Sequence, residues 1–452
     1  MSRNEIAVVV LEYNRHKRLQ LILERLTEQD IGQDRFRVVV VDNGSAEPLR
    51  PVVDDYASKL SIEYLRIEKP VSRGKARNCG IEAVREPAVL ILDGDTLPDR
   101  DLVRRHLEVL ADPDVAVSLG SRRERRVRSL TTPVPLDHDS PTTFAALHEQ
   151  AERDLRVPDI DQPVIQANFR RIGYFFFYSH NIAVRTDIAK AAGGFNEELV
   201  GWGLEDLEFG FRIREVLSGG QTMKWSPQAG SVHVPHLRDF VRNFGDLKSN
   251  QEKLHQSYKS FHWEGHKFAT PLLECLRIMM IEELTEALPH DAVLPELPEI
   301  ERWVGDVESG DSWLLGIGRV AGWRGIAPQL RSSLVDWRDP AVPSFCGTQF
   351  LHQDNTFRNV INLDVWRALP WHHVSEALGE ARRVSQFPIF VATAAHDANV
   401  AGLESSPGLD RSVPRFVEDA EWLAAAVRDF GLACETTRTA EAVAVRVLPV
   451  GY

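Results

Sequence analysis

The sequence predicts an α/β protein in which a domain with a mostly parallel sheet is followed by a helical connector and a second, smaller α/β domain. Two observations support this prediction. Apolar runs alternate with helix-period patterns over the first hundred residues, and the same alternation returns after residue 300. In addition, 452 residues exceed what one ordinary hydrophobic core accommodates, which favours two or three domains.

In the N-terminal half, the predicted strands are short apolar runs, as expected for parallel strands that are buried on both faces. Leu19, Ile22, Leu23 and Leu26 recur at helical spacing between two of these strands. The expected strands are 6–11, 37–41, 61–67 and 88–92, and the expected helices are 16–29 and 74–84. This order predicts a doubly wound sheet, which binds its ligands at the carboxyl ends of its strands.

Later segments differ in regularity. Proline and charge clusters predict an irregular excursion over 122–168, before regular patterning resumes up to residue 236. A helical pattern then covers 239–288, and a Pro- and Glu-rich linker is expected at 288–298. The second α/β rhythm predicts strands at 313–317, 360–365, 388–393 and 442–450, and helices at 374–384 and 417–430. We therefore expect domains at 1–238, 239–300 and 301–452.

The composition, 43% hydrophobic and 26% charged, is that of a soluble globular protein. A net charge of −13 argues against a nucleic-acid-binding protein, which usually carries a basic face. No apolar run approaches the roughly 20 residues of a membrane span, and no signal-peptide pattern is present. The four cysteines are scattered without CxxC spacing, which fits a reducing compartment. We therefore expect a cytoplasmic location.

Asp93-Gly94-Asp95 directly follows the apolar run 88–92. Two carboxylates at the exit of a strand can point into one crevice, and they are hard oxygen ligands suited to Mg²⁺ or Mn²⁺. The alternative is an ordinary acidic turn.

Three further motifs accompany this turn. Asp42 ends another strand-like run, and Arg73 and Arg77 belong to a basic, Gly-punctuated helix start that suits a diphosphate. The most specific motif is Gly-Trp-Gly-x-Glu-Asp at 201–206, because a turn that exposes an indole beside two acids is typical of a saccharide site. A purely structural interpretation, with acids at a helix N-terminus, explains the acids but not the tryptophan.

Taken together, these motifs resemble a known family. Val-Leu-Glu-Tyr-Asn-Arg at 10–15, Val-Asp-Asn-Gly-Ser at 41–45, Ala-Arg-Asn-x-Gly-Ile at 76–81 and the Asp-Gly-Asp turn follow one another as in the GT-A glycosyltransferase fold. The specific likeness is to the family 2 group of bacterial inverting transferases. The 201–206 segment is similar to that of β-1,4-galactosyltransferases and the chondroitin-polymerase group. The resemblance covers about half of the chain.

The resemblance implies a role for each matching residue. Asp42 would contact the nucleotide base, usually uracil. The other nucleotide-binding residues would be Tyr13, Asn14, Arg73, Arg77, Asp93 and Gly94. Glu12 stands where proline or threonine is commoner in the family, and the loop 71–74 is shorter than usual.

The metal and acceptor sites are implied in the same way. Asp95 would ligate the metal together with His233, and the His-x-x-His spacing makes His236 the alternative. An imidazole ligand favours Mn²⁺ over Mg²⁺; a buried structural histidine is the other interpretation. Trp202 and Glu205 would contact the acceptor, and Asp206 would be the catalytic base.

The implied reaction moves a hexose or N-acetylhexosamine from a UDP-sugar to a glycan, natural-product or peptide acceptor, with inversion. Two alternatives of other classes are a nucleotidyltransferase, which should show a Gly-rich basic signature near its first strand, and a nucleotide-sugar-binding protein without transfer activity. For the basic run 122–126, which could attract an anionic acceptor, a solvated face is the interpretation that we prefer.

The segment 360–384 resembles the middle of class I methyltransferases, which would make the protein bifunctional. The glycines at 316–322 lack the acidic residue that normally precedes them, and Asp336 is either a ribose ligand or a turn residue. We favour a degenerate domain that binds the acceptor or mediates a homodimer.

Overall fold

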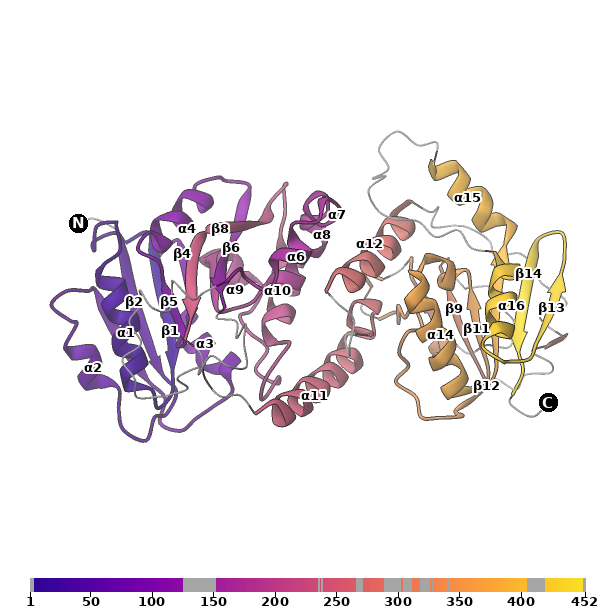
Figure 1. Ribbon diagram of the computed structural model, residues 1–452, viewed down its shortest axis with the longest axis horizontal. Coiled ribbons are helices and arrows are strands. Elements are labelled where there is room, and N and C mark those ends of the chain that lie inside the picture. Colours follow the sequence, from indigo (N-terminus) through magenta and orange to yellow (C-terminus); the bar gives the residue numbers. More distant parts are fainter. Residues whose placement is uncertain are drawn as a thin grey trace, which may run out of the picture. The chain divides into compact units, whose positions relative to one another are not determined.

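The computed structural model describes residues 4–124, 152–234, 236, 239–265, 271–287, 302–303, 311–317, 326, 328–335, 337–339, 341–404 and 419–449. The chain divides into two units, residues 1–250 and 251–452. The boundary falls within helix α11 (Phe240–Tyr258), inside the range that the sequence assigns to a helical connector. Figure 1 shows the sheet of each unit.

One half of the first sheet is parallel and matches the predicted strands. It consists of β1 (Ile6–Glu12), β2 (Phe36–Asp42), β3 (Ile62–Arg66) and β4 (Ala88–Asp93). The order is β3-β2-β1-β4, so the chain winds outward from β1 to β3 and then returns to the other side of β1. The topological switch point therefore lies between the carboxyl ends of β1 and β4, where ligands bind in doubly wound folds.

The other half of this sheet mixes directions. It consists of β7 (Asn181–Arg185), β6 (Val115–Arg123), β8 (Thr222–His233) and β5 (Thr96–Pro98), in this order after β4. β6 runs parallel to β8, whereas β7 is antiparallel to both of its neighbours and β5 is antiparallel to β8. The expected irregular excursion from residue 122 is wrong at its start, because β6 continues to Arg123. Small and polar residues in its Val-Ala-Val-Ser-Leu-Gly-Ser-Arg-Arg sequence obscure the strand pattern.

Helices pack against this sheet as the apolar spacing predicts. α1 (His16–Thr27) buries the four leucine and isoleucine side chains that define its apolar face, and all four are fully inaccessible to solvent. α3 (Arg73–Glu82) lies close to β1, since a Cβ on Gly80 would be 2.4 Å from Val9. The other helices are α2 (Arg50–Asp54), α4 (Leu102–Leu110), α6 (Val157–Ile160), α7 (Pro163–Ala167), α8 (Phe169–Ile172), α9 (Thr186–Ala191) and α10 (Glu205–Val216).

The second unit contains the other sheet, with four parallel strands and an antiparallel hairpin. Its order is β10 (Arg331–Ser333), β9 (Ser312–Gly316), β11 (Phe357–Leu363), β12 (Ser385–Thr393), β14 (Ala442–Val447) and β13 (Cys434–Arg438). Its helices are α12 (Pro271–Ala287), α14 (Trp371–Val384), α15 (Ala394–Glu404) and α16 (Ala420–Asp429). The second α/β domain is thereby confirmed.

Some predictions for this unit lie outside the described residues. These are the linker at 288–298, the glycines beyond residue 317 and Asp336, so the methyltransferase resemblance stays a prediction. Of the helices that the structure describes, none has the length and hydrophobicity of a membrane span.

Candidate active site

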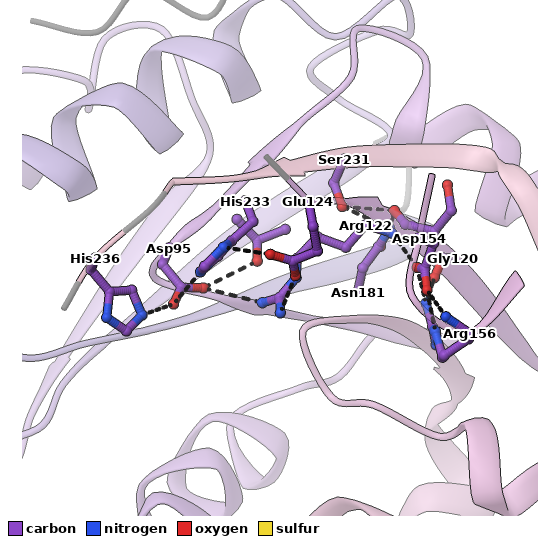
Figure 2. A network of polar contacts seen from close by, with 12 residues as sticks. Asp95, Gly120, Arg122, Glu124, Asp154, Arg156, Asn181, Ser231, His233 and His236 are labelled. Carbon is purple, nitrogen blue, oxygen red and sulfur yellow. Dashed lines mark hydrogen bonds and ion pairs between the residues drawn. The ribbon is translucent and has the colours of Figure 1, made fainter. Parts of the chain in front are cut away.

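Asp95 lies in the turn between β4 and β5, beside two histidines (Figure 2). Its Oδ2 is 3.3 Å from Nε2 of His233 and 3.0 Å from Nε2 of His236. Within the described part of the chain, these three side chains are the group that could hold a metal ion, with one ligand atom from each and all within 4.8 Å of one another. One carboxylate oxygen and two imidazole nitrogens suit Mn²⁺ and related divalent ions. Both histidines of the His-x-x-His spacing therefore lie at Asp95.

Strand register brings these residues together. Thr96 pairs with His233 across β5 and β8, and the Val234 amide donates a hydrogen bond of 2.8 Å to the Asp95 carbonyl. His236 follows two residues later, although it is 141 residues from Asp95 in the sequence. The pairing of a short strand with the end of β8 thus positions the whole cluster.

Two further charged residues join the cluster, Arg122 from β6 and Glu124 from the position directly after it. Arg122 Nη1 lies 3.4 Å from Asp95, and Arg122 Nη2 lies 2.8 Å from Glu124. The other oxygen of Glu124 is 2.8 Å from Nδ1 of His233. The expectation of a solvated face is wrong for Arg122, whose side chain is only 12% exposed. The reason is that β6 pairs with β8 next to His233, a long-range pairing that leaves no local sequence signal.

The contacts in this cluster control its charges. Burial disfavours the ionised form of Asp95, but hydrogen bonds from His233 and His236 outweigh burial and hold the pKa of Asp95 well below its ordinary value. Burial likewise opposes the charged form of His233, yet its bonds to Asp95 and Glu124 raise the pKa of this imidazole. Asp95 is therefore ionised at neutral pH, as a metal ligand must be.

The first acid of the Asp-Gly-Asp turn has a different partner. Asp93 accepts a hydrogen bond of 2.8 Å from Nη2 of Arg77, and Nη1 of Arg77 lies 3.1 Å from Glu205. The Arg77 guanidinium, 4% exposed, also lies over the Phe195 ring at 5.2 Å. Arg77 therefore links the turn to the first residue of α10, and the two acids of the turn point to different neighbours.

Asp206 lies in the first turn of α10, next to Glu205. Burial, assisted by the negative charge of Glu205, raises the pKa of Asp206 to about 7. An acid with a pKa near physiological pH can both accept and release a proton there, which is what a general base requires. Glu205 itself is buried against Arg77, so its predicted contact with an acceptor stays a prediction.

The Gly-Trp-Gly turn before α10 needs both of its glycines. Gly201 and Gly203 have φ of 84° and 101°, and a Cβ on them would lie 2.3 Å from the Asp246 carboxylate and 2.8 Å from Leu247. The Trp202 amide donates to Asp246 at 3.1 Å. Helix α11 therefore holds the turn, and Trp202 is half-buried rather than fully exposed.

On the predicted nucleotide side, the loops after β1 and β2 are tied together. The backbone N–H of Asn14 donates a hydrogen bond of 2.8 Å to the Ser45 hydroxyl, and the side-chain Oδ1 of Asn14 accepts one of 2.8 Å from the Ala46 backbone amide. Asp42 is fully buried and accepts hydrogen bonds from four donors, namely the Ser45 and Leu49 amides, the Tyr64 hydroxyl and Arg66. Its contact with a nucleotide base stays a prediction.

Three other predicted nucleotide ligands differ in exposure. Tyr13 is 46% exposed, Arg73 is exposed at the start of α3, and Gly94 is half-buried. A Cβ on Gly94 would be 2.6 Å from the backbone oxygen of Leu11 and 2.3 Å from Glu12 Oε2, so glycine is needed there. Burial raises the pKa of Glu12 to about 8. In the sequence, Glu12 stood out only as a departure from the family pattern, which predicted no such shift.

Comparisons with known proteins show which proteins this chain is similar to. Residues 7–190 match the model of glycosyl transferase family 2. The chain is 29% identical over 266 residues to validoxylamine A glucosyltransferase of Streptomyces hygroscopicus subsp. limoneus, a match that covers 56% of this chain and 57% of that protein. It is 28% identical over 222 residues to chondroitin synthase of Escherichia coli, which covers 46% of this chain and 32% of that protein.

Among solved structures, the chain is similar to a mannosyltransferase from Pyrobaculum calidifontis in complex with GDP-Man and Mn²⁺. The identity is 20%, the TM-score is 0.40, and the match covers 60% of this chain and 68% of the other. The chain spans little more than half the length of the validoxylamine A glucosyltransferase and about a third of the length of the chondroitin synthase.

Proposed function

We propose that this chain, in which residues 7–190 match the model of glycosyl transferase family 2, transfers a hexose or N-acetylhexosamine from a UDP-sugar to a nucleophile of a glycan, natural product or peptide. One observation carries the proposal. The turn 93–95 joins two sets of groups, because Asp95 faces the two histidines whereas Asp93 reaches α10 through Arg77. Donor activation and acceptor deprotonation would therefore meet at one turn.

In this proposal, each group has a separate task. Asp95, His233 and His236 would hold a Mn²⁺ or Mg²⁺ ion, which when bound supplies positive charge to the leaving diphosphate. Arg122, held beside Asp95, would add to that charge. Asp206 would take the proton from the acceptor as its oxygen attacks the anomeric carbon. A single displacement of this kind inverts the anomeric centre.

The relatives support the choice of substrate class. One is named a glucosyltransferase and the other a chondroitin synthase. The range that matches the family model, residues 7–190, includes the Asp-Gly-Asp turn. A hexosyl or N-acetylhexosaminyl donor is the class that these names favour. The acceptor class belongs to the proposal, as does any role of the second unit, because both depend on the whole protein.

A panel of nucleotide sugars tests the proposal. The purified chain should hydrolyse one UDP-sugar slowly in the absence of an acceptor, and added EDTA should stop hydrolysis until Mn²⁺ is restored. Release of UDP would be measured with each sugar in turn. Tight UDP-sugar binding without hydrolysis or transfer to any glycan would instead indicate a binding protein, and hydrolysis that is unaffected by EDTA would reject the metal.

A further inference from the structure

We propose that Glu124 is a positioning residue, which orients His233 and holds Arg122 at the correct distance from Asp95. This inference rests on the proposed metal-dependent function, since it concerns how the protein prepares its own ligands. Glu124 directly follows β6, and nothing in its local sequence, a run of arginines, distinguishes it from a surface charge.

The side chains form a closed ring of four, which Figure 2 shows. Asp95 contacts His233 at 3.3 Å, His233 contacts Glu124 at 2.8 Å, Glu124 contacts Arg122 at 2.8 Å, and Arg122 returns to Asp95 at 3.4 Å. All four are less than one fifth exposed. Each member is therefore held from two sides, and the carboxylate of Glu124 closes the ring opposite Asp95.

The contact between Glu124 and His233 decides which imidazole nitrogen of His233 faces Asp95. An ionised carboxylate can only accept hydrogen bonds, so Nδ1 of His233 must be the nitrogen that carries a proton toward Glu124. Nε2 is then the nitrogen that points to Asp95 and is the one offered to an ion. Carboxylates that fix a ligating histidine in this manner raise its basicity and set the orientation of the ring.

The contact with Arg122 prevents a competition. A guanidinium beside Asp95 is a positive charge that would occupy the same carboxylate as a metal ion. Arg122 lies closer to Glu124, at 2.8 Å, than to Asp95, at 3.4 Å. Without Glu124, we expect Arg122 to pair more closely with Asp95 and to reduce its availability as a ligand. Both contacts thus make the same prediction for the loss of Glu124.

The pairing of β6 with β8 supports this placement. Arg122 pairs with Ser231 and Arg123 with Val232, so Glu124, the residue that directly follows β6, falls beside His233. The same strand pair offers a matched control. Arg123 is paired with Asp99 at 2.6 Å, which is another arginine–carboxylate contact near the end of β6. Asp99 is not one of the four ring members.

The test is the affinity of the full chain for Mn²⁺, measured by electron paramagnetic resonance of the free ion. We expect Glu124→Ala to raise the Kd by about 10- to 100-fold, as for other residues that support metal ligands. Glu124→Gln should have a smaller effect. The amide oxygen of glutamine can still accept a hydrogen bond from His233, but the neutral amide no longer forms an ion pair with Arg122. Asp99→Asn should leave the Kd unchanged.

Absorption of bound Co²⁺ gives a second readout, which should change in the Glu124 variants and not in Asp99→Asn, while circular dichroism checks folding. A wild-type Kd in Glu124→Ala would overturn this inference and leave the proposed function intact. An equal loss in Asp99→Asn would also overturn it. If Glu124→Ala fails to fold, a wild-type Kd in Glu124→Gln overturns it. A wild-type chain that binds no Mn²⁺ would overturn both proposals.

Discussion

Each unit contains a network of charged side chains with little exposure to solvent, and the two networks are satisfied in different ways. In the second unit, Glu264 accepts hydrogen bonds from the backbone amides of Cys346, Thr348 and Gln349, and it is fully buried. Arg277, also fully buried, donates to two backbone carbonyls and pairs with Glu274 at 2.6 Å. Hydrogen bonds with the backbone and the close Arg277–Glu274 ion pair are the main contacts that stabilise these charges.

In the first unit, by contrast, Asp95 has no backbone donor among its described partners. It is surrounded by His233, His236 and Arg122, three side chains that offer nitrogen atoms to the same carboxylate. Buried charges that the backbone satisfies are fixed parts of a fold, whereas side chains that converge on one carboxylate can exchange a partner for a ligand. This difference teaches which network is the candidate site, and variants on both sides can test it.

The largest expected effect is on turnover. Asp206→Asn keeps the size of the side chain but removes the base, so we expect kcat to fall by about 10²- to 10⁴-fold. UDP binding, measured by calorimetry, should stay near the wild-type value. Glu198→Gln, which changes an exposed acid shortly before α10, serves as the control. Wild-type turnover in Asp206→Asn would exclude this residue as the base.

The next effect concerns the backbone-satisfied network. Arg277→Met removes the ion pair with the buried Glu274 and the donor to two backbone carbonyls, so we expect the second unit to lose about 3–5 kcal/mol of unfolding free energy. Urea unfolding measures this loss. Arg338→Met, which removes an exposed pair with Glu286, should change the free energy by about 1 kcal/mol or less.

This pair of variants also tests the comparison directly. Mn²⁺ affinity should be the same in Arg277→Met and the wild type at low urea, because this network belongs to the other unit. A weaker Mn²⁺ affinity, or a loss no greater than that of Arg338→Met, would contradict the distinction between the two networks.

For the converging network, Asp95→Ala should act on binding and not on stability. Removal of the carboxylate leaves both histidines without a shared partner, and we expect Mn²⁺-dependent affinity for UDP to fall by about 10- to 100-fold. Calorimetry with and without Mn²⁺ separates this effect from metal-independent binding. Equal affinity in the variant and the wild type, with Mn²⁺ present, would reject the metal role of Asp95.

The smallest effect is a shift in pH dependence. Because the pKa of Asp206 is raised to about 7 and a base must be deprotonated, kcat/KM should rise with pH through a midpoint near 7. Burial is the main cause, and the charge of Glu205 contributes. Glu205→Gln should therefore move the midpoint to lower pH. A profile that is flat between pH 5 and 8, or an unchanged midpoint in Glu205→Gln, would argue against this assignment.

Local sequence patterns determined much of the fold. The strands near 6–11, 37–41 and 88–92 were predictable, because a short continuous apolar run bounded by polar turns is typical of a parallel strand that is buried on both faces. The leucine spacing of α1 likewise predicted its buried face. Asp95, His233 and Asp206 could be singled out because the short motifs that contain them resemble those of a known family. β6 could not, since its small and polar residues carry no clear period.

The tertiary structure alone decided how these motifs combine. Arg122 and Glu124 reach Asp95 and His233 because β6 pairs with β8, and Arg77 ties Asp93 to Glu205 across 128 residues. The Trp202 turn depends on α11 in the same way. Sequence identifies chemistry that is local in the chain. The distances between charges, which set the pKa values and the ligand geometry, come from strand pairing and helix packing between segments that the sequence separates.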